Sequence, residues 1–277
     1  NEFSRLNARI IFLCASTLGT TQIMLNSKSE SFPNGIAKSS GVLGHYLMDH
    51  IFESGANGVY PGFQDKYFRG RRPNGIYIPR YHNIDKKDDR FLRGFGFQGG
   101  GKRPGWKRGR AIKGLGVDLK EQLKRPGPWT FSLGGFGEML PDKRNKVWLD
   151  QKQKDKWGIP ILNIECVLRE NELKMLKVMA EDAKEMLEAS GMVDVTTYNN
   201  SAPPGLAIHE MGTARMGRDP NTSVLNKHNQ CHDVPNLFIT DGSCMTSSAC
   251  QNPSLTYMAL TARAADSAVE MLQEGRI

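Results

Sequence analysis

The pattern of apolar and polar positions divides the chain into three parts. The first part opens with a short apolar run, Ala8–Ala15, bounded by polar residues, which is typical of a buried strand in a parallel sheet. Residues 16–25 follow as a predicted turn and helix. From Ile51 to about Asn200 the pattern changes to short alternating runs separated by Gly and Pro, which predicts an antiparallel sheet with one covered face. The predicted strands are 75–79, 91–97, 129–133, 147–149 and 160–167.

A helix long enough to cover that sheet is predicted over 171–190. Its apolar residues recur every three or four positions, and Gly191 is a suitable helix stop. The last part returns to the first pattern, with a strand over 236–240 and an apolar helix beginning near Ser254. The prediction is a mixed α/β (α+β) protein, in which residues 1–50 and 201–277 share one discontinuous domain and residues 51–200 form another.

The composition is that of an ordinary globular protein, with 39% hydrophobic and 24% charged residues among 277. The net charge of +8 comes largely from clusters at 69–72, 102–110 and 143–146. No recognised nucleic-acid module accompanies them, so a solvated basic surface is the favoured interpretation. No apolar run reaches the ~18 residues of a membrane helix. We therefore expect a soluble protein, and the sequence leaves its compartment, cytoplasmic or periplasmic, undetermined.

The cysteines and histidines do not predict a metal or disulfide framework. Five cysteines, an odd number without repeated spacing, do not form a disulfide pattern. His228, Cys231 and His232 are close in sequence, but a fourth ligand is lacking, so this stretch is interpreted as a turn before the strand at 236–240.

One stretch imitates a dinucleotide-binding loop. Residues 94–99 satisfy Gly-x-Gly-x-x-Gly, a pattern that requires an apolar strand before it and a helix after it. A charged run precedes this copy and a Gly-rich basic run follows it. It is therefore interpreted as a Gly-rich strand and loop of the middle domain.

The strongest chemical signal is a pair of phrases in 206–260. His209 stands before Gly212 and Thr213, and Asn252 stands before Pro253 at the start of the last helix, where its amide could cap the helix. An imidazole, with an ordinary pKa near ~6.5, can take the proton of a hydroxyl, while an amide holds the oxygen. A lone His in a loop is usually structural, and only the combination favours catalysis.

These phrases resemble the C-terminal signature of the glucose–methanol–choline (GMC) oxidoreductases, and residues 234–243 resemble the family segment that reaches the flavin dinucleotide. The His-x-x-Gly-Thr and Asn-Pro-x-x-Thr forms resemble the sugar-oxidising branch, with pyranose oxidase and gluconate dehydrogenase large subunits. The resemblance implies FAD-dependent oxidation of a sugar or alcohol hydroxyl, with His209 and Asn252 as catalytic residues. It also implies six contacts with FAD: Ala15, Gly19, Asp241, Gly242, Asn252 and Pro253.

The resemblance further assigns residues 1–50 and 201–277 to part of an FAD-binding domain and residues 51–200 to a substrate-binding domain. It predicts a helix over 41–50, ending in Asp49 and His50 with structural roles. The FAD pyrophosphate loop of the family is not found in this sequence, so we expect the chain to be the C-terminal part of a longer enzyme. The missing N-terminal FAD-binding segment would supply the loop, either from the same chain or from another chain.

Several alternatives remain open from the sequence. Without a pyrophosphate loop, the chain could be a non-catalytic fragment that acts only as a binding or structural domain. The sugar and the hydroxyl are undetermined, and oxygen, a quinone or a cytochrome could each be the electron acceptor.

Overall fold

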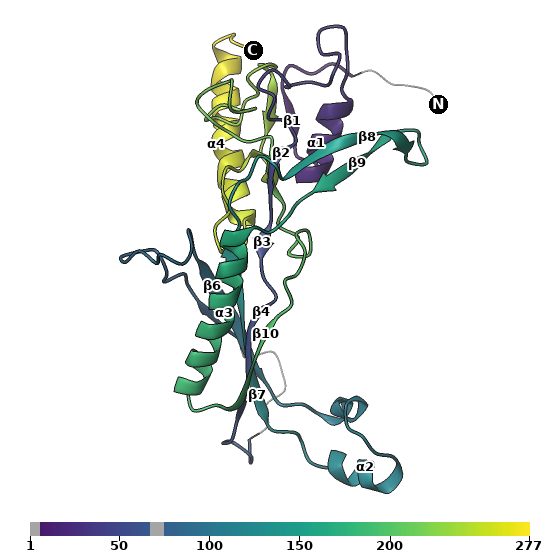
Figure 1. Ribbon diagram of the computed structural model, residues 1–277. Helices are drawn as coiled ribbons and strands as arrows, with labels where there is room; N and C mark the ends of the chain where they lie inside the picture. The colour runs from purple at the N-terminus through teal and green to yellow at the C-terminus, as the bar shows by residue number, and fades with distance from the viewer. Residues whose placement is uncertain (1–5, 67–74) are drawn as a thin grey trace. The chain divides into compact units, whose positions relative to one another are not determined.

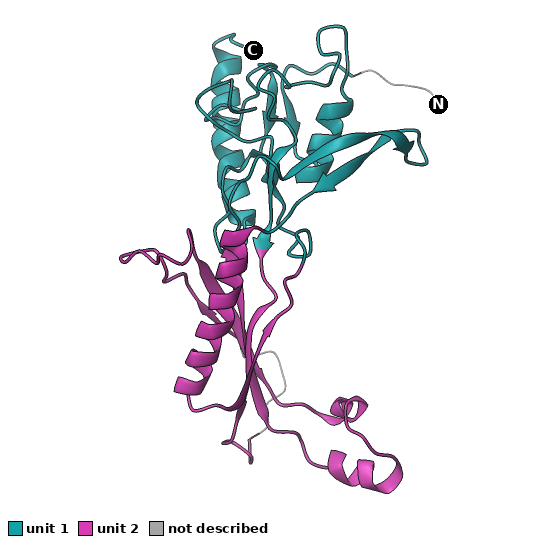
Figure 2. Ribbon diagram, in the orientation of Figure 1, with its two compact units in different colours: residues 1–50, 138–168, 203–277 teal, residues 51–137, 169–202 magenta. Residues whose placement is uncertain are grey.

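The computed structural model describes residues 6–66 and 75–277. The basic cluster at 69–72 lies outside the described residues. The chain forms two compact units, shown in different colours in Figure 2. Unit 1 comprises residues 1–50, 138–168 and 203–277, and unit 2 comprises residues 51–137 and 169–202.

In unit 1 a parallel pair of strands joins the two ends of the sequence. Strand β1 (Ile11–Leu13) pairs in parallel with β12 (Leu237–Ile239). Helix α1 (Thr17–Asn26) follows β1, and helix α4 (Ser254–Gln273) ends the chain. These elements lie where the apolar runs of the sequence predict them. Phe238 of β12 packs with Ala264 and Ala268 of α4.

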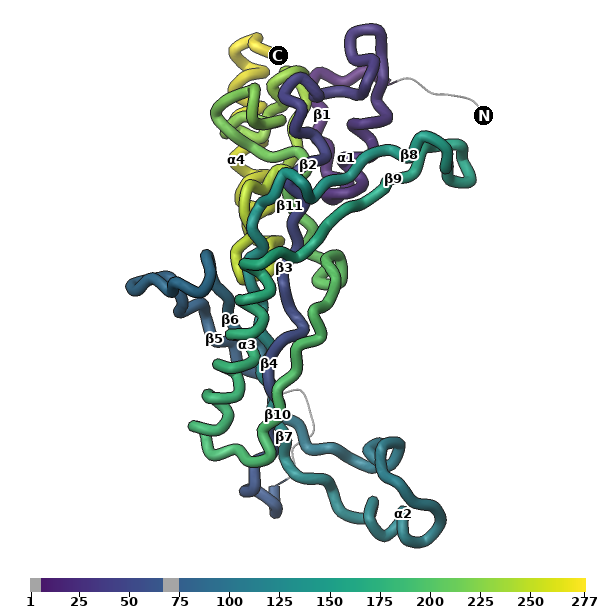
Figure 3. The backbone as a smooth tube through the Cα atoms, viewed as in Figure 1, coloured from purple at the N-terminus to yellow at the C-terminus, as the bar shows by residue number. Residues whose placement is uncertain are grey.

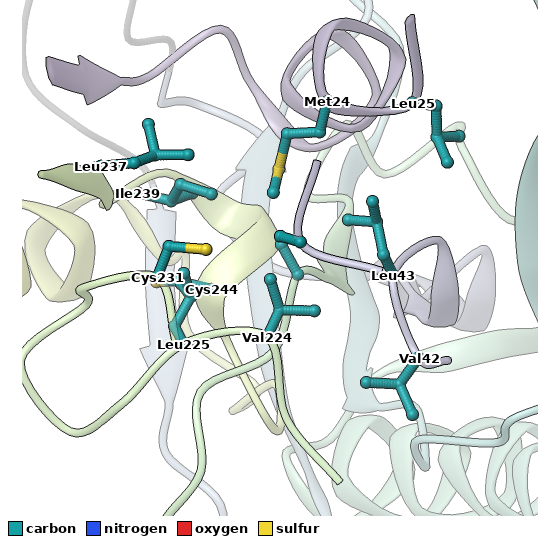
Figure 4. Packing of buried hydrophobic residues seen from close by; sticks show 12 residues of the cluster. Met24, Leu25, Val42, Leu43, Val224, Leu225, Cys231, Leu237, Ile239 and Cys244 are labelled. Carbon is teal, nitrogen blue, oxygen red and sulfur yellow. The ribbon is translucent and has the colours of Figure 1, made fainter. Parts of the chain in front are cut away.

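The main core of unit 1 fills the space between α1, β12 and the loops of residues 214–245. Figure 4 shows Met24 of α1 and Ile239 of β12 among the packed side chains, with Val224 and Leu225 from the loop side. Cys244 is fully buried there, and burial raises the pKa of its thiol to about 12. It is therefore a small apolar core residue that stays protonated at neutral pH.

The second sheet of unit 1 corrects a prediction. Its order is β11 (Met211–Thr213), β2 (His45–Met48), β8 (Lys146–Lys154) and β9 (Pro160–Glu165), all antiparallel, with β8 and β9 forming a ribbon in Figure 3. The helix predicted over 41–50 is thus wrong, because the segment contains β2 and the start of β3 (His50–Ile51). Gly41, Gly44 and Tyr46 have φ of 64°, 86° and 63°, which interrupt a right-handed helix.

A second correction concerns the domain predicted over residues 51–200. Strand β7 (Trp129–Glu138) belongs to the sheet of unit 2, whereas β8 pairs with β2 and β9 in unit 1. Residues 138–168 therefore belong to the same compact unit as the chain ends, not to the expected 51–200 block. Pairing between strands that are distant in the sequence, rather than the local residue pattern, sets this boundary between the two units.

Unit 2 is an antiparallel sheet with a helix against it. The order is β10 (Val193–Asn199), β4 (Ser54–Tyr60), β7, β6 (Phe95–Lys102) and β5 (Gly75–Ile78), with β3 also pairing with β7. Helix α3 (Glu170–Ala189) packs against β4 and β10, as Figure 1 shows. A Cβ on Gly137 of β7 would lie 2.5 Å from the methyl carbon of Met179, so the missing side chain makes room for the helix.

The Gly-rich pattern at 94–99 lies in and just before β6, in agreement with its interpretation as a strand. Phe95 and Phe97 are fully buried in this strand. The connection from β6 to β7 carries the basic run 102–110, the short helix η1 (Trp106–Arg110) and α2 (Gly116–Leu123). Over the described ranges, none of the helices combines the length and apolar character needed to cross a membrane.

Candidate active site

A buried carboxylate fixes the loop that carries His209. Asp49, only 1% exposed, follows β2 and faces the loop of residues 205–209. Its Oδ1 accepts hydrogen bonds from the backbone N–H groups of His50 (2.8 Å) and His209 (3.1 Å). Its Oδ2 accepts from the N–H groups of Gly205 (2.6 Å) and Ala207 (3.3 Å). One buried carboxylate thus accepts from four backbone N–H groups and holds His209 against the end of β2.

We expect Asp49→Asn to lower the free energy of unfolding by about 1–3 kcal/mol, the cost of leaving buried donors unsatisfied. The substitution keeps the shape but turns one acceptor oxygen into an N–H₂ donor that faces backbone N–H groups. Urea denaturation measures the change. The matched control is Asp219→Asn, an exposed loop carboxylate that accepts from the backbone N–H of Asn221. Equal stability of the two variants would contradict the role of Asp49.

The two residues predicted to be catalytic contact each other, although 43 positions separate them. The Nδ2 of Asn252 lies 3.1 Å from the Nε2 of His209. On its other side, the Nδ1 of His209 lies 2.9 Å from the Nδ1 of His50, and the two rings meet edge to face at 89°. The Nε2 of His50 contacts the carbonyl oxygen of Ala249. A continuous chain of hydrogen bonds therefore runs from Ala249 through both imidazoles to Asn252.

The contact of Asn252 with His209 overturns its expected role as a helix cap. Helix α4 begins at Ser254, its N-cap residue is Pro253, and no side chain caps it. The amide of Asn252 is directed to the imidazole instead. From the resemblance, His50 was expected to have only a structural role. The one local sign of a place in the site is the polar pair Asp49–His50 after an apolar run.

Burial lowers the pKa of His50 below its ordinary value of 6.5. The charge of His209 also lowers this pKa and the charge of Asp49 raises it, and both effects are smaller than that of burial. The contact with the carbonyl of Ala249 raises it as well. Because burial dominates, the folded protein favours the neutral imidazole.

This shift predicts a loss of stability in mild acid. Between the lowered pKa of the folded state and about 6.5, the unfolded chain binds a proton that the folded chain excludes, so stability falls as the pH decreases below about 6.5. Urea denaturation at about pH 7.5 and about pH 5.5 measures the loss. His50→Gln lacks the titrating group and should lose less stability between the two pH values than the parent does. Equal losses would refute the prediction.

A cavity of about 300 Å³ lies beside His209. Four of the residues predicted to form the site line this cavity: His209, Asp241, Gly242 and Pro253. The other lining residues are Cys14, Ser16, Thr17, Ile208, Glu210, Ser254 and Tyr257. Ala15 lies between two lining residues of the β1–α1 turn, and Gly19 lies in the first turn of α1. Sequence reasoning missed Thr17 and Tyr257, and neither stands in a distinctive motif.

Asp241 joins three segments around the cavity. It precedes the short helix η2 (Gly242–Cys244), and its Oδ1 accepts from the backbone N–H of Ser243 at 2.9 Å. Its Oδ2 accepts from the hydroxyl of Thr20 in α1. A Cβ on Gly242 would lie 2.4 Å from the carbonyl oxygen of Glu210 and 2.6 Å from Oγ1 of Thr17, so only glycine fits there. The strand end, α1 and the His209 loop therefore lie close together.

Two helix N-termini also line the cavity. Ser16 and Thr17 belong to the start of α1, and Pro253 and Ser254 to the start of α4. Neither helix has a side-chain cap or an acidic residue in its first turn. Their first N–H groups and the positive ends of their dipoles suit phosphate groups or the negative charge of a reduced flavin. The starts of α1 and α4 therefore suit an anionic group of a bound cofactor.

The comparison with known families agrees with this geometry. The model of the family described as GMC oxidoreductase matches residues 141–261, a range that includes both His209 and Asn252. The chain belongs to the GMC oxidoreductase family. The recognition made from the two phrases is confirmed, and so is the mixed α/β fold class.

At least two curated proteins are similar along nearly the whole chain. A 2-methyl-1,2-propanediol dehydrogenase of Mycolicibacterium austroafricanum is 33% identical over 94% of this chain and 48% of its own length. The fructose dehydrogenase large subunit of Gluconobacter japonicus is 26% identical over 98% of this chain and 49% of its own length. The chain thus spans about half the length of these GMC relatives.

The fold matches solved structures of the family. A formate oxidase of Aspergillus oryzae superposes with a TM-score of 0.61 at 14% identity, over 96% of this chain and 55% of that one. A likeness at this identity concerns the fold alone. It agrees with the mixed α/β architecture of the GMC chain described above.

The stretch containing His228, Cys231 and His232 forms turns and short bridges before β12. The Nε2 of His232 lies 3.0 Å from the hydroxyl of Ser223, and Cys231 is buried in the core. Across the residues that the structure covers, no group of three or more metal-ligating side chains could hold an ion.

Proposed function

We propose that this chain carries the proton-transfer groups of an FAD-dependent enzyme that oxidises the hydroxyl of a sugar or related alcohol to a carbonyl. One observation carries the proposal: the Nε2 of His209 and the Nδ2 of Asn252 meet at 3.1 Å, and His209 lines a cavity. A basic nitrogen and an amide donor at this spacing can contact the same hydroxyl oxygen.

In the reaction, the oxygen of the substrate hydroxyl contacts both side chains from the same side. The Nε2 of His209 accepts the hydroxyl proton, and the Nδ2 of Asn252 donates to the oxygen while negative charge develops on it. The C–O bond becomes a carbonyl as the C–H bond of the same carbon breaks, and its electron pair leaves with the hydrogen as hydride. When bound, FAD supplies the two-electron acceptor for that hydride.

The proposed FAD contacts come from the segments around the cavity. The backbone at Ala15 and Gly19 lies in the β1–α1 turn, where small side chains let a ligand approach closely. Asp241 is assigned to the ribityl or pyrophosphate portion, through its side chain or through the backbone of Gly242. The carboxylate itself would bind a hydroxyl, because it repels phosphate. Gly242 contributes backbone next to it, and Asn252 and Pro253 contribute backbone at the flavin ring.

Unit 2 is proposed as the substrate-binding domain. The fold supports this assignment, since unit 2 has its own antiparallel sheet covered by α3. The names of the relatives, a diol dehydrogenase and a fructose dehydrogenase subunit, support small polyols and sugars as the substrate class.

The surface of unit 1 supports a further segment as a partner. Phe12 of β1 is 39% exposed, and Leu255 and Met258 near the start of α4 are 76% and 67% exposed. Strands of parallel sheets are usually buried on both faces, and β1 pairs with β12 alone in its sheet among the described residues. We propose that an N-terminal FAD-binding segment, with the pyrophosphate loop, covers this surface.

The test is a purified enzyme that contains this chain, examined first for a flavin absorbance spectrum. It is then mixed without oxygen with a panel of sugars and small diols, and bleaching of the flavin reports oxidation of the donor. Adding oxygen, a quinone or a cytochrome separately shows which acceptor restores the spectrum. A flavin-loaded enzyme that no alcohol or sugar bleaches would refute the proposal. A preparation without flavin would favour the non-catalytic alternative.

A further inference from the structure

We propose that His50 is a positioning residue that holds His209 in the tautomer with hydrogen on Nδ1, so that Nε2 carries the lone pair that accepts a proton. The inference rests on the proposed function, because it explains how His209 is prepared to act as a base. It follows from three successive contacts in one chain of hydrogen bonds.

The first contact fixes the hydrogen on His50. Its Nε2 lies within hydrogen-bonding distance of the carbonyl oxygen of Ala249. A carbonyl oxygen accepts hydrogen bonds and cannot donate them, so the Nε2 of His50 must carry the hydrogen. The direction of this bond does not depend on the protonation of any other group.

The second contact passes this constraint to His209. Because burial favours the neutral form of His50, a hydrogen on its Nε2 leaves a lone pair on its Nδ1. The Nδ1 atoms of His50 and His209 are 2.9 Å apart, a distance that requires one hydrogen between them. That hydrogen belongs to His209, which therefore donates from Nδ1.

The third contact lies at the cavity and agrees with the first two. A neutral His209 with hydrogen on Nδ1 has its lone pair on Nε2, and the atom that faces this nitrogen is the Nδ2 donor of Asn252. When Nε2 takes up a proton, the bond from Nδ1 to His50 persists and strengthens, because the donor is then charged. The contact with His50 thus stabilises His209 both as a neutral base before the proton transfer and as a cation after it.

The surroundings keep His50 in place. It is 2% exposed, and Oδ1 of Asp49 accepts from the backbone N–H groups of both His50 and His209. The two imidazoles therefore share one anchor for their backbones as well as a direct contact between their rings. A ring held at both ends cannot rotate to offer a donor to His209.

The direct test is a nitrogen-15 NMR spectrum of histidine-labelled protein, which distinguishes protonated from unprotonated ring nitrogens. The six histidines are assigned by substituting them one at a time. We expect His209 to carry hydrogen on Nδ1 and His50 on Nε2 at neutral pH. A His209 with hydrogen on Nε2, or a mixture of the two tautomers, would overturn the inference. The tautomers are measured in the parent protein, and the variants serve only to assign its signals.

The functional test compares two substitutions of His50 with a matched control. His50→Leu removes the acceptor for Nδ1 of His209 and should slow flavin reduction by about 10–10²-fold, the range for partners that orient a functional histidine. His50→Gln keeps one donor and one acceptor and should recover part of the rate. The control is His45→Leu in β2, since His45 contacts the carbonyl oxygen of Lys143 at 2.8 Å and lies outside the cavity lining. It should keep the parental rate.

The outcomes separate the inference from the proposed function. If His50→Leu reduces flavin as fast as His45→Leu, the positioning role is refuted even when His209 proves essential. If His209→Ala reduces flavin at the parental rate, the proposed base is refuted, whereas the tautomer is still decided by the spectrum. Melting temperatures of the variants identify any loss of rate that comes from unfolding.

Discussion

Replacing His209 with alanine should lower the rate of flavin reduction by about 10²–10⁴-fold, the usual contribution of a general base. The imidazole is held from both sides, by Nδ1 at His50 and by Nε2 at Asn252. Among the described residues that line the cavity, His209 is the only one with a basic nitrogen in its side chain. Stopped-flow reduction without oxygen, with an alcohol or sugar donor and an FAD-loaded enzyme that contains this chain, measures the rate.

The matched control for this prediction is His232→Ala. His232 belongs to the same unit and its Nε2 contacts the hydroxyl of Ser223, but it does not line the cavity. It should reduce flavin at the parental rate. If His209→Ala also does so while melting at a lower temperature, then His209 is a structural residue and the chemistry lies elsewhere.

Asn252→Ala should slow flavin reduction by about 10²–10³-fold, the typical cost of removing one donor to a developing oxyanion. Asn252 is exposed, so its loss should leave stability nearly unchanged and the effect can be assigned to the reaction. Asn252→Asp preserves the shape but replaces the N–H donor with an acceptor and should be equally slow. The control is Asn221→Ala, since Asn221 is an exposed loop residue that contacts Asp219.

The double variant of His209 and Asn252 tests whether the two side chains act on the same oxygen. If they do, the combined loss should be smaller than the product of the two separate losses, because the first substitution already disables the shared site. Fully multiplicative losses would mean that the two residues act independently. The same stopped-flow assay supplies all three rates.

The sequence by itself determined the elements whose pattern is local. The periodic apolar residues of 171–190 predicted α3, and the short apolar runs predicted β1 and β12. Burial of one helix face or of a whole strand such as β12 leaves a mark in consecutive residues, and that mark can be read without the fold. β1 carries the same apolar pattern, although Ile11 and Phe12 are exposed in the structure. The phrases around His209 and Asn252 were sufficient to recognise the GMC family, because several spaced motifs agree.

The tertiary structure decided what depends on partners distant in the sequence. Residues 41–50 form strands because β11 and β8 pair with them and because Gly44 takes a left-handed φ beside the carbonyl of Val147. Asn252 turns to an imidazole 43 residues away instead of capping α4. His50 reaches His209 across 159 residues, a contact that no local pattern encodes. Hydrogen bonds and sheet pairing outweigh local propensity at these positions, since a buried polar group must find its partner wherever the fold supplies one.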